Sequence, residues 1–498
     1  MTEPLVSYNA RTAEVLGAVT ASALSDVDAA CVAAADAFAL WQGSAGPQRA
    51  ALLRGLADAL ELAREALVPL ADQETALGPV RLNGELDRTA FQLRRFAGIA
   101  ERGEPYACLD DPAVEGPPPA GHPAMQRWHV PLGPVAMFSA SNFPFAFSVL
   151  GGDTASALAA GCPVVVKAHP GHPLLSQQVF QLVQQVLAAQ GLPAGLIGMV
   201  QGASHALGVH LVRHPAVAAA AFTGSTRGGA ALAAEAAARP RPIPFFGELG
   251  SINPVVALPG ELAAHGATLA TTLAGSIALG CGQFCTNPGL IVLVDALAGV
   301  NTQAVNDAFV AQLAQALAAQ QPHAMLTQGM RTNFEAGVAH WAEAGAEFVW
   351  RETTPAAQPP RPVLAQVSAT DFIAQAALRE EVFGPSSLIV RAANRAQVLQ
   401  VLQAVGGSLT VTLWGVQADN DDSAALVRGA MAITGRVLFS GVPTGVAVTA
   451  AQQHGGPWPS STRAETTSVG DAALTRFLRP VCLQDAPTWL TARQGRPL

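Results

Sequence analysis

One loop of the chain carries a cysteine that could act as a nucleophile. The segment GCGQFCTNPG (280–289) places Cys285 among Gly, Pro and Asn residues, between an expected helix and an expected strand. A thiol in such a loop can be exposed, but it becomes a nucleophile only with an activating partner. Most cysteines are instead buried and inert. That inert description fits the cysteines outside this loop: Cys31, Cys108, Cys162 and Cys482. Cys281, four residues upstream, is interpreted as structural, with a redox partner of Cys285 as the alternative.

Two further stretches offer partners for that thiol. FFGELGSINP (245–254) contains Glu248 after an apolar run, and burial there would raise the pKa of Glu248 toward that of a general base. SASNFPF (139–145) places Asn142 in a loop at a strand end, where its amide could donate to a developing oxyanion. The structural alternatives are a carboxylate bound to backbone N–H groups and a turn asparagine before a proline.

A third feature is the single lysine of the chain, Lys167, in VVVKAHP (164–170). A bias of genome composition toward arginine would leave one lysine by accident. A chemical reason would be a need for a compact, flexible ammonium, either as a Schiff base or as a point contact to a ribose or phosphate. The lysine alone does not decide between these.

The elements that must position these residues alternate between strands and helices. Short apolar runs begin near 133, 162, 195 and 216, and amphipathic segments follow three of them, one closing at Gly161 and another at Gly191. This alternation predicts a doubly wound parallel sheet, which binds ligands at the carboxyl ends of its strands. Lys167 lies at one such end. The turn FTGSTRGG (222–229) lies at another, where helix N–H groups favour a phosphate, although such turns are common.

The remaining segments complete an α/β chain. The first hundred residues show helical periodicity, and residues 110–123 form a Pro/Gly-rich connector before an expected extended arm at 125–133. A second α/β section starts after residue 250 with a strand, a helix through 262–280 and the strand GLIVLV. It runs to about 450, and the last fifty residues are expected to return to short strands.

Composition excludes several classes of function. The 498 residues are half hydrophobic and only 13% charged, with a net charge of −8. These values exclude a disordered chain, disfavour nucleic acid and anionic membranes as partners, and predict two or three domains. The long uncharged stretches at 128–152 and 266–294 contain Gly, Pro and Asn, and are expected to be core and loops rather than membrane spans. Six scattered cysteines without a CxxC pair, and no recognisable signal peptide, predict a cytoplasmic protein without a zinc or other metal site.

Together these stretches resemble the aldehyde dehydrogenase superfamily over roughly residues 5–485. Five motifs occur in the family's order: SNFPF, VVVKAHP, FTGSTRGG, FFGELGS with GQFCTNPG, and EEVFGP (380–385). The resemblance implies that Cys285 attacks the aldehyde carbon, that Asn142 and the Cys285 N–H hold the oxyanion, and that Glu248 activates the water that hydrolyses the thioester. It also implies cofactor contacts from Lys167 to the adenosine ribose, from Gly224 and Ser225 to the pyrophosphate, from Glu381 to the nicotinamide ribose, and from Phe383 beside the nicotinamide ring.

The same resemblance sets the expected cofactor. NAD-preferring members carry a Glu three residues after the matching lysine, where it repels a 2′-phosphate, and this chain has Pro170 there. His169 and Arg227 could add positive charge near a 2′-phosphate, or could simply face solvent. NADP is therefore expected as the cofactor, with NAD as a second one left open.

The amino-acid sequences of these motifs are similar to those of one branch of the family. That branch contains 2-oxoglutarate semialdehyde (2,5-dioxopentanoate) dehydrogenases and NADP-linked long-chain aldehyde dehydrogenases, so oxidation of the semialdehyde to 2-oxoglutarate is expected and a long-chain aldehyde is the alternative. Arg463 and the loop SGVPTGVAV (440–448) are candidates for binding the substrate carboxylate. This loop departs from the branch at Ser440, Val442 and Ala447, which leaves the aldehyde open.

Other classes of protein remain as alternatives. A lysine Schiff-base enzyme would centre on Lys167, a CoA-acylating dehydrogenase would be expected to lack Glu248, and a non-catalytic protein would be expected to lack at least one of Cys285, Glu248 and Asn142. The resemblance implies an NAD(P)-binding domain (1–120 and 133–249), a catalytic domain (250–450) and an oligomerisation flap (121–132 and 474–490). Pairing of flap strands between subunits would give a homodimer or a homotetramer.

Overall fold

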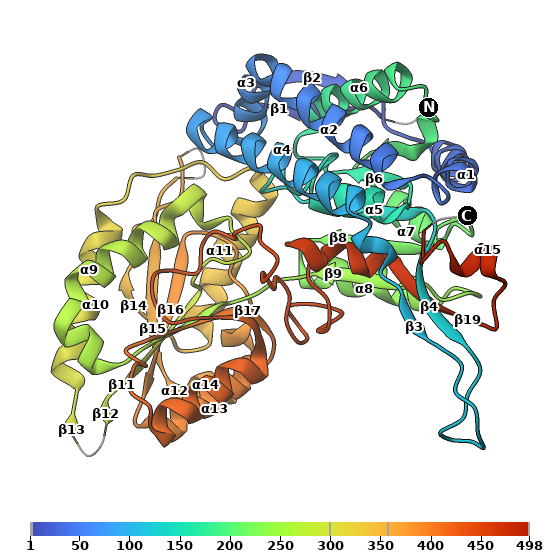
Figure 1. Ribbon diagram of the computed structural model, residues 1–498. Coiled ribbons are helices and arrows are strands. Elements are labelled where there is room, and N and C mark those ends of the chain that lie inside the picture. The colour runs from blue at the N-terminus through green and yellow to red at the C-terminus, as the bar shows by residue number, and fades with distance from the viewer. Residues whose placement is uncertain (1–2, 298–299, 356–357, 497–498) are drawn as a thin grey trace.

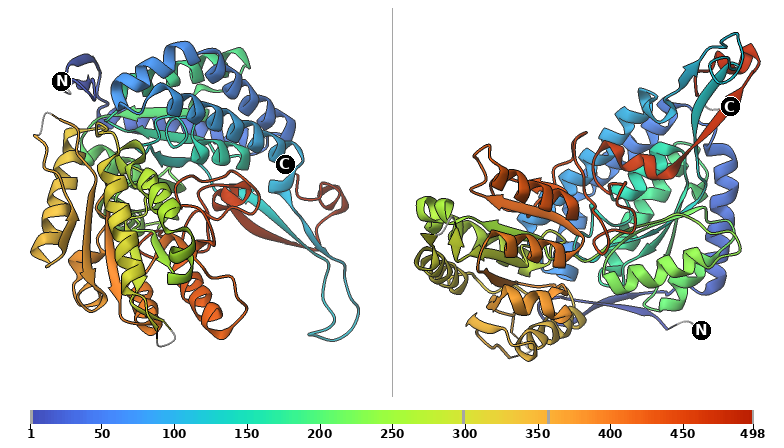
Figure 2. Two further views of the ribbon diagram at one scale, coloured as in Figure 1. Left: turned by 90° about the vertical axis from the view of Figure 1, so that its left-hand side faces the viewer. Right: turned by 90° about the horizontal axis from the view of Figure 1, so that it is seen from below.

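The computed structural model describes residues 3–297, 300–355 and 358–496. Two large parallel sheets with helices on their faces lie side by side, and a smaller sheet forms an arm that projects from the body (Figures 1 and 2). The predicted α/β fold, with a doubly wound parallel sheet followed by a second α/β section, is confirmed. The predicted domain ranges include residues 1–2, 298–299 and 356–357, which lie outside the described residues.

The first sheet has five parallel strands in the order β7-β6-β5-β8-β9. Its strands are Val135–Phe138 (β5), Val164–Ala168 (β6), Ile197–Gln201 (β7), Ala219–Thr223 (β8) and Phe245–Glu248 (β9). They are almost wholly apolar because helices cover both faces. The connecting helices are Gly152–Ala160 (α5), Pro173–Ala189 (α6), His205–Arg213 (α7) and Thr226–Ala237 (α8). The strands and helices predicted from the sequence in this region are all present.

A layer of N-terminal helices packs on this sheet. These helices are Leu24–Trp41 (α1), Gly46–Leu62 (α2), Arg64–Thr75 (α3) and Pro79–Glu101 (α4), and their apolar faces join one core with α5 and α6. The helical periodicity of the first hundred residues is thus explained. It did not reveal the hairpin of Leu5–Tyr8 (β1) and Val15–Val19 (β2), because these strands are short and half exposed.

The second sheet has the order β14-β15-β16-β11-β10-β17-β18, parallel except at the β14 edge. Its strands are Pro254–Ala257 (β10), Leu290–Val294 (β11), Glu347–Trp350 (β14), Val363–Ser368 (β15), Ser386–Ala392 (β16), Ser408–Trp414 (β17) and Thr434–Leu438 (β18). Its helices are Pro259–Ala278 (α9), Gln303–Ala318 (α10), Gln328–Glu343 (α11), Ala369–Ala374 (α12), Arg395–Val405 (α13) and Asp421–Ile433 (α14). A short antiparallel pair, Ala296–Leu297 (β12) and Val300–Asn301 (β13), lies at its margin.

Helix α9 is the one described helix that is long and apolar enough to cross a membrane, over Pro259–Gly282. One face of this helix packs on the second sheet through Leu262, Leu273 and Ile277. The same test is passed by helices of proteins that span no membrane, and in α9 the buried residues lie on the face that packs on the sheet.

The arm is a three-stranded antiparallel sheet of Leu109–Asp111 (β3), Met125–Pro131 (β4) and Leu478–Gln484 (β19), in the order β19-β4-β3. Strands β4 and β19 fall inside the ranges predicted for the flap, whereas β3 falls in the range predicted for the cofactor domain. The last fifty residues contain β19, the 3-10 helix Asp471–Phe477 (η5) and the helix Thr488–Thr491 (α15). The expected return to several short strands was therefore wrong: residues 449–470 run as loops that contact the two large sheets.

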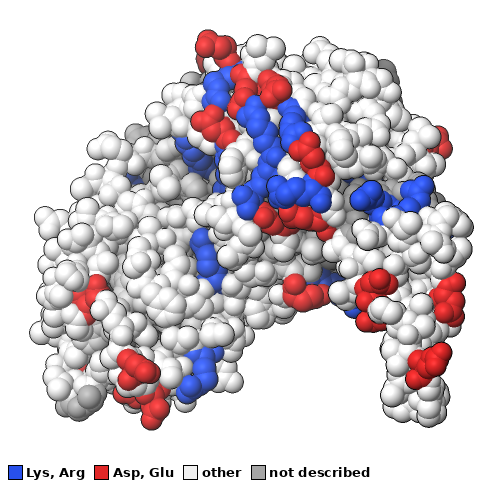
Figure 3. Space-filling view, viewed as in Figure 1, with Lys and Arg blue, Asp and Glu red and all other residues white. Residues whose placement is uncertain are grey.

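Charged side chains are sparse on the face seen in Figure 3, except over the N-terminal helices, where both signs alternate. Several of them form ion pairs between α2 and α4, including Arg54 with Glu101 and Arg94 with Asp58 and Glu61. Exposed pairs of this kind contribute little each. Neither sign forms a large field there, and the expectation that nucleic acid is not a partner stays a prediction.

Candidate active site

The thiol of Cys285 is presented by an unusual backbone turn. After α9, the 3-10 segment Leu279–Gly282 (η3) holds Gly280, Cys281 and Gly282 at φ values of 55°, 60° and 64°. A Cβ at Gly282 would lie 2.1 Å from the backbone oxygen of Gly384, so only glycine fits there. Cys285 is partly exposed, whereas Cys281 to Phe284 are buried.

The buried neighbour Cys281 packs in an apolar cluster with Met325, Phe334, Val338 and Val363. Burial raises the pKa of its thiol to about 12. A thiol with this pKa stays protonated and is a poor redox partner, which agrees with the structural interpretation of Cys281.

The backbone of the Cys285 loop is fixed by Asn253, whose side chain is fully buried. Its Nδ2 donates to the backbone oxygens of Cys285 at 2.8 Å and Asn287 at 2.9 Å. Its Oδ1 accepts hydrogen bonds from Ser251 and Thr410. The sequence analysis did not single out Asn253, although its side chain holds the loop of the nucleophile.

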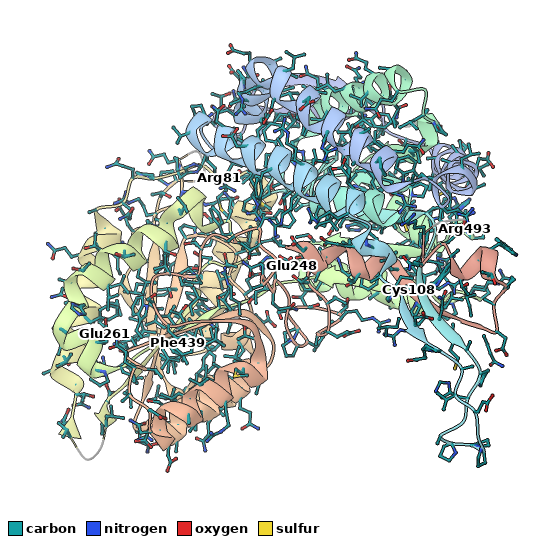
Figure 4. The ribbon with its side chains drawn as sticks, viewed as in Figure 1. Arg81, Cys108, Glu248, Glu261, Phe439 and Arg493 are labelled. Atoms are coloured by element: carbon teal, nitrogen blue, oxygen red, sulfur yellow. The ribbon has the colours of Figure 1, made fainter. Side chains whose placement is uncertain are left out.

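Glu248 ends β9 at the edge of the first sheet, close to the junction of the two large domains (Figure 4). Loop residues near the C-terminus lie along this edge: Leu249 N donates to Ser460 O, and Gly247 N donates to the Thr462 hydroxyl. The structure thereby brings a segment more than 200 positions away to the carboxylate of Glu248.

That segment supplies a residue that the sequence analysis missed, His454. Its Nε2 lies 2.9 Å from Glu248 Oε1 and 3.6 Å from Cys285 Sγ, and the side chain is fully buried. Ser468 Oγ donates to the other carboxylate oxygen of Glu248. His454 N donates to the Thr467 hydroxyl, and Ser468 N donates to His454 O, so the side chains of His454 and Ser468 reach Glu248 together. In the sequence, the one available sign of a functional role for His454 is its position directly before two glycines, Gly455 and Gly456.

The expectation that Glu248 has a raised pKa was wrong. Burial alone would raise the pKa of this carboxyl, but the neighbouring His454 and the hydroxyl of Ser468 favour the ionised form and hold the pKa below its usual value. The pKa of the Cys285 thiol is raised well above its usual value, by burial first and by the negative charge of Glu248 second. The resting site therefore contains a carboxylate and a neutral thiol.

Asn142 lies where an oxyanion group is needed. Its amide Nδ2 donates to Gln283 O at 3.0 Å, which joins the SNFPF loop to the Cys285 loop. The amide keeps its second N–H, and the backbone N–H of Cys285 takes part in none of the hydrogen bonds found among the described residues. Two donors thus remain beside the thiol, as an oxyanion hole requires.

Glu248, Cys285 and His454 place one possible ligand atom each within 4.8 Å of one another, which is a spacing that could hold a metal ion. The same atoms make the contacts described above. The expectation that the protein uses no metal stays a prediction.

The predicted cofactor residues lie along the carboxyl ends of the first sheet and on the facing loop. Gly224 and Ser225 are exposed at the start of α8, where the Ser225 hydroxyl accepts from Gly228 N and caps the helix. Arg227 is exposed in the first turn of α8. Lys167 Nζ donates to Gly202 O at 2.7 Å, and burial lowers the pKa of its ammonium to about 8.

His169 does not supply the positive charge considered for it. Burial lowers the pKa of its ring well below the usual value, and the neighbouring His172 and Lys167 lower it further. Its Nδ1 accepts from Gly171 N, so His169 is a neutral turn residue. Pro170, the next residue, lies half-buried in the same turn.

Glu381 and Phe383 line a pocket with Ser251, Gly282 and Asn287, next to the Cys285 loop. Glu381 Oε1 accepts from Ser251 N, and burial raises the pKa of this carboxyl to about 7. At the carboxyl end of β7, next to the strand of Lys167, Gln201 Oε1 is buried without a hydrogen-bond partner among the described residues. A dinucleotide fits this arrangement: a free acceptor and an ammonium at one end, a helix N-terminus in the middle and a carboxylate at the other.

A parallel-sheet domain with these groups, beside a thiol that has an imidazole and a carboxylate next to it, is typical of a thiol-dependent, nicotinamide-linked oxidoreductase. Comparison with known proteins agrees: the description "Aldehyde dehydrogenase family" matches residues 2–472, and the chain belongs to that family. It is an enzyme, an aldehyde dehydrogenase, and the family uses NAD(P). The resemblance stated from the five motifs is thereby confirmed.

Among similar proteins, the chain is 44% identical to α-ketoglutaric semialdehyde dehydrogenase 2 of Azospirillum brasilense over 94% of this chain and 88% of that protein. It is 39% identical to α-ketoglutaric semialdehyde dehydrogenase of Acinetobacter baylyi, over 95% and 90%. Geranial dehydrogenase of Castellaniella defragrans is 31% identical over 88% of both chains. The fold also matches the crystal structure of betaine aldehyde dehydrogenase from Staphylococcus aureus, with a TM-score of 0.80, 21% identity and coverage of 98% and 93%.

Proposed function

We propose that the protein oxidises 2-oxoglutarate semialdehyde to 2-oxoglutarate with NADP. The observation that carries the substrate is similarity over nearly the whole chain to two proteins named for this aldehyde, at 44% and 39% identity. The arrangement of Cys285, His454 and Glu248 supports the chemistry, because it joins a nucleophile, a proton acceptor and a base for water in one buried cluster.

The first half of the reaction forms a bond between Cys285 Sγ and the aldehyde carbon. The thiol is neutral at rest, so its proton must leave as the bond forms. Two acceptors lie within reach, the Glu248 carboxylate and His454 Nε2 at 3.6 Å, and we assign the proton to His454, which leaves Glu248 free to activate water. The oxygen of the former carbonyl becomes an oxyanion held by the Cys285 N–H and the Asn142 amide. A nicotinamide held beside Glu381 and Phe383 would supply the acceptor for the hydride of that carbon, and Cys285 would then carry the thioester.

The second half is hydrolysis of the thioester. Glu248 is ionised, so its carboxylate can take a proton from a water molecule that attacks the thioester carbon. The carbon–sulfur bond breaks, the acid leaves, and the Cys285 sulfur regains the proton held by His454. Because Ser468 and His454 hold Glu248 in place, the carboxylate is oriented at the cost of some basicity.

NADP, rather than NAD alone, is proposed from the surroundings of Lys167. No carboxylate among the described residues pairs with this ammonium, and Pro170 occupies the place where a carboxylate would oppose a 2′-phosphate. Arg227 in the first turn of α8 adds an exposed positive charge near the same end of the sheet. His169 is withdrawn from this role because its ring is neutral.

We also propose that the chain works in the cytoplasm as a homodimer or homotetramer. The exposed edges of β19 and β3 in the projecting arm offer unpaired backbone groups that a second subunit could cover.

The test is nicotinamide reduction by the purified enzyme, with kcat/KM measured for 2-oxoglutarate semialdehyde with NADP and with NAD, and for decanal. A high value for the semialdehyde with NADP leading is expected. A better rate on decanal would favour the second candidate, an apolar aldehyde. The 31% identity to geranial dehydrogenase supports this second candidate. Equal values with NAD and NADP would overturn the cofactor preference alone.

A further inference from the structure

Helix α4 turns three ionisable side chains toward the loop that carries Asn142. Arg81, Glu85 and Arg88 are spaced four and three residues apart, so they share one face of the helix. Glu85 is buried, and its Oε1 accepts from Phe145 N at 2.8 Å and Ala146 N at 3.0 Å. This face of α4 therefore packs directly on the SNFPF loop.

The two guanidinium groups on this face are not fully paired. Arg81 Nη2 donates to Asn142 O at 2.6 Å, but its Nη1 is buried without a hydrogen-bond partner in the described part of the chain. Arg88 Nε and Nη2 are both buried without such a partner. Neither arginine forms an ion pair with any described carboxylate. Burying a cation without a partner is costly, so an anionic ligand is the natural complement.

Stacking places these groups beside the catalytic loops. The Arg81 guanidinium lies 4.4 Å from the ring centroid of Phe284, which precedes Cys285, and 5.0 Å from that of Phe143, which follows Asn142. Arg88 lies 6.0 Å from the Phe143 centroid and 5.5 Å from that of Phe147. Figure 4 shows Arg81 at the end of α4 that approaches the catalytic domain.

The charge balance at this face favours an anion. Two guanidinium groups share the single carboxylate of Glu85 on this face, and burial raises the pKa of that carboxyl. Glu248 also acts electrostatically on Arg88, from the other side of the site. The positive charge of Arg88 acts on Cys285, whose thiol pKa it lowers against the larger effect of burial. Arg88 is thus within electrostatic range of the reacting sulfur.

We propose that Arg88, with Arg81 beside it, binds the carboxylate of the substrate while the aldehyde carbon lies at Cys285 Sγ. Nε and Nη2 of one guanidinium form the fork that binds a carboxylate through two parallel hydrogen bonds, and both are free in Arg88. An extended five-carbon chain separates its terminal carbons by roughly 5 Å. The inference rests on the proposed function, since it assigns the substrate's carboxylate to a residue.

Arg88 replaces Arg463, one of the two candidates taken from the sequence for this role; the loop 440–448 stays a candidate. Arg463 is 48% exposed, and its nearest carboxylate is Glu465, two residues along its own loop. An exposed arginine is surrounded by water, whose high dielectric constant weakens its attraction for an anion. A buried guanidinium therefore discriminates more strongly between an anionic and a neutral substrate.

The experiment compares Arg88→Gln and Arg88→Lys with the parent enzyme, using 2-oxoglutarate semialdehyde and pentanal, a neutral aldehyde of the same carbon number. Arg88→Gln is expected to raise KM for the semialdehyde by about 30-fold or more and to change kcat/KM for pentanal by less than about threefold. Arg88→Lys keeps a cation but loses the fork, and should fall between. Arg94→Gln, on the exposed side of the same helix, is the matched control and should change neither substrate.

Protection of the thiol tests the same site without turnover. In the parent enzyme 2-oxoglutarate should slow alkylation of Cys285 by iodoacetamide more than pentanoate does, and Arg88→Lys should weaken this protection.

Equal losses of kcat/KM on both aldehydes in Arg88→Gln would overturn the inference and make Arg88 a packing residue. A parent preference for the semialdehyde that survives Arg88→Gln would overturn this inference alone. A parent enzyme without that preference would overturn the proposed substrate as well.

Discussion

Nε2 of His454 lies 2.9 Å from Oε1 of Glu248, and the same nitrogen lies 3.6 Å from Cys285 Sγ. One nitrogen cannot donate to the carboxylate and accept from the thiol at the same time. When Nε2 carries a proton it binds Glu248, and when it does not it can take the proton of Cys285. The protonation of His454 therefore couples the nucleophile that starts the reaction to the base that ends it.

The first prediction concerns His454→Gln. This variant keeps a polar side chain but cannot accept the thiol proton, so kcat should fall by about 10²- to 10⁴-fold, the usual contribution of general acid–base catalysis. Alkylation of Cys285 by iodoacetamide should slow in the same variant at pH 7, because the neutral thiol loses its base.

The control is His205→Gln, at an exposed histidine that begins α7. It should leave turnover and alkylation unchanged. If His454→Gln were alkylated as fast as the parent enzyme, the thiol would have another proton acceptor, and the role assigned to His454 would be wrong.

The second prediction concerns Glu248→Gln. Thioester formation does not need this carboxylate, so rapid mixing should show about one equivalent of reduced nicotinamide per site, followed by turnover at least 10²-fold slower than in the parent. Cys285→Ser should show no burst. A Glu248→Gln enzyme that lost the burst together with turnover would place Glu248 in the first half of the reaction.

The pKa of Glu248 gives the sign of the pH dependence. Because this pKa lies below its usual value, the carboxylate stays ionised throughout the neutral range and hydrolysis should not lose its base as the pH falls to 5. An acid limb of kcat near neutrality would then belong to another group. The rate that follows the burst, measured from about pH 5 to about pH 8, checks this expectation.

Most of this site was visible in the sequence, but not the contacts that set its chemistry. Cys285, Glu248 and Asn142 lie in short motifs at the ends of strands, and the alternation of strands and helices places such ends along one edge of a sheet. His454 contacts Glu248 from a loop about 200 residues away, so no local pattern could show that the carboxylate is paired rather than isolated. The predicted direction of its pKa was wrong for that reason.

Arg88 was missed for a related reason. Three charged residues on an otherwise amphipathic helix resemble a solvated face, and the sequence analysis singled out none of them. Only tertiary packing shows that this face is covered by the aromatic rings of the SNFPF loop and that two nitrogens of Arg88 lack partners.

The third prediction uses the raised pKa of Glu381, about 7 in the cofactor-free protein. If this carboxylate accepts hydrogen bonds from the nicotinamide ribose, binding requires the ionised form. The ionised fraction falls as the pH drops through 7, so KM for NADP should rise toward acid by up to tenfold per pH unit.

Glu381→Gln should give a higher and pH-independent KM, because an amide does not titrate in this range. Glu343→Gln, at an exposed carboxylate that ends α11, should keep the parent profile. The same acid rise of KM in Glu381→Gln would assign the titration to a different group.

The last prediction separates the support of the Cys285 loop from its chemistry. Asn253→Ala removes the two hydrogen bonds to the backbone oxygens of Cys285 and Asn287, and it leaves the hydroxyls of Ser251 and Thr410 with fewer partners. Unpaired buried groups cost about 1–3 kcal/mol of unfolding free energy, and the left-handed φ of 45° at this position adds strain for alanine. We expect urea unfolding to show a loss of unfolding free energy in that range, together with a kcat at least tenfold lower.

The control is Asn420→Ala, which removes only the N-cap of α14. It should lose about 1 kcal/mol of unfolding free energy and keep its kcat. If both variants lost stability and neither lost turnover, the position of Cys285 would not depend on Asn253, and the turn at Gly280–Gly282 alone would hold the nucleophile.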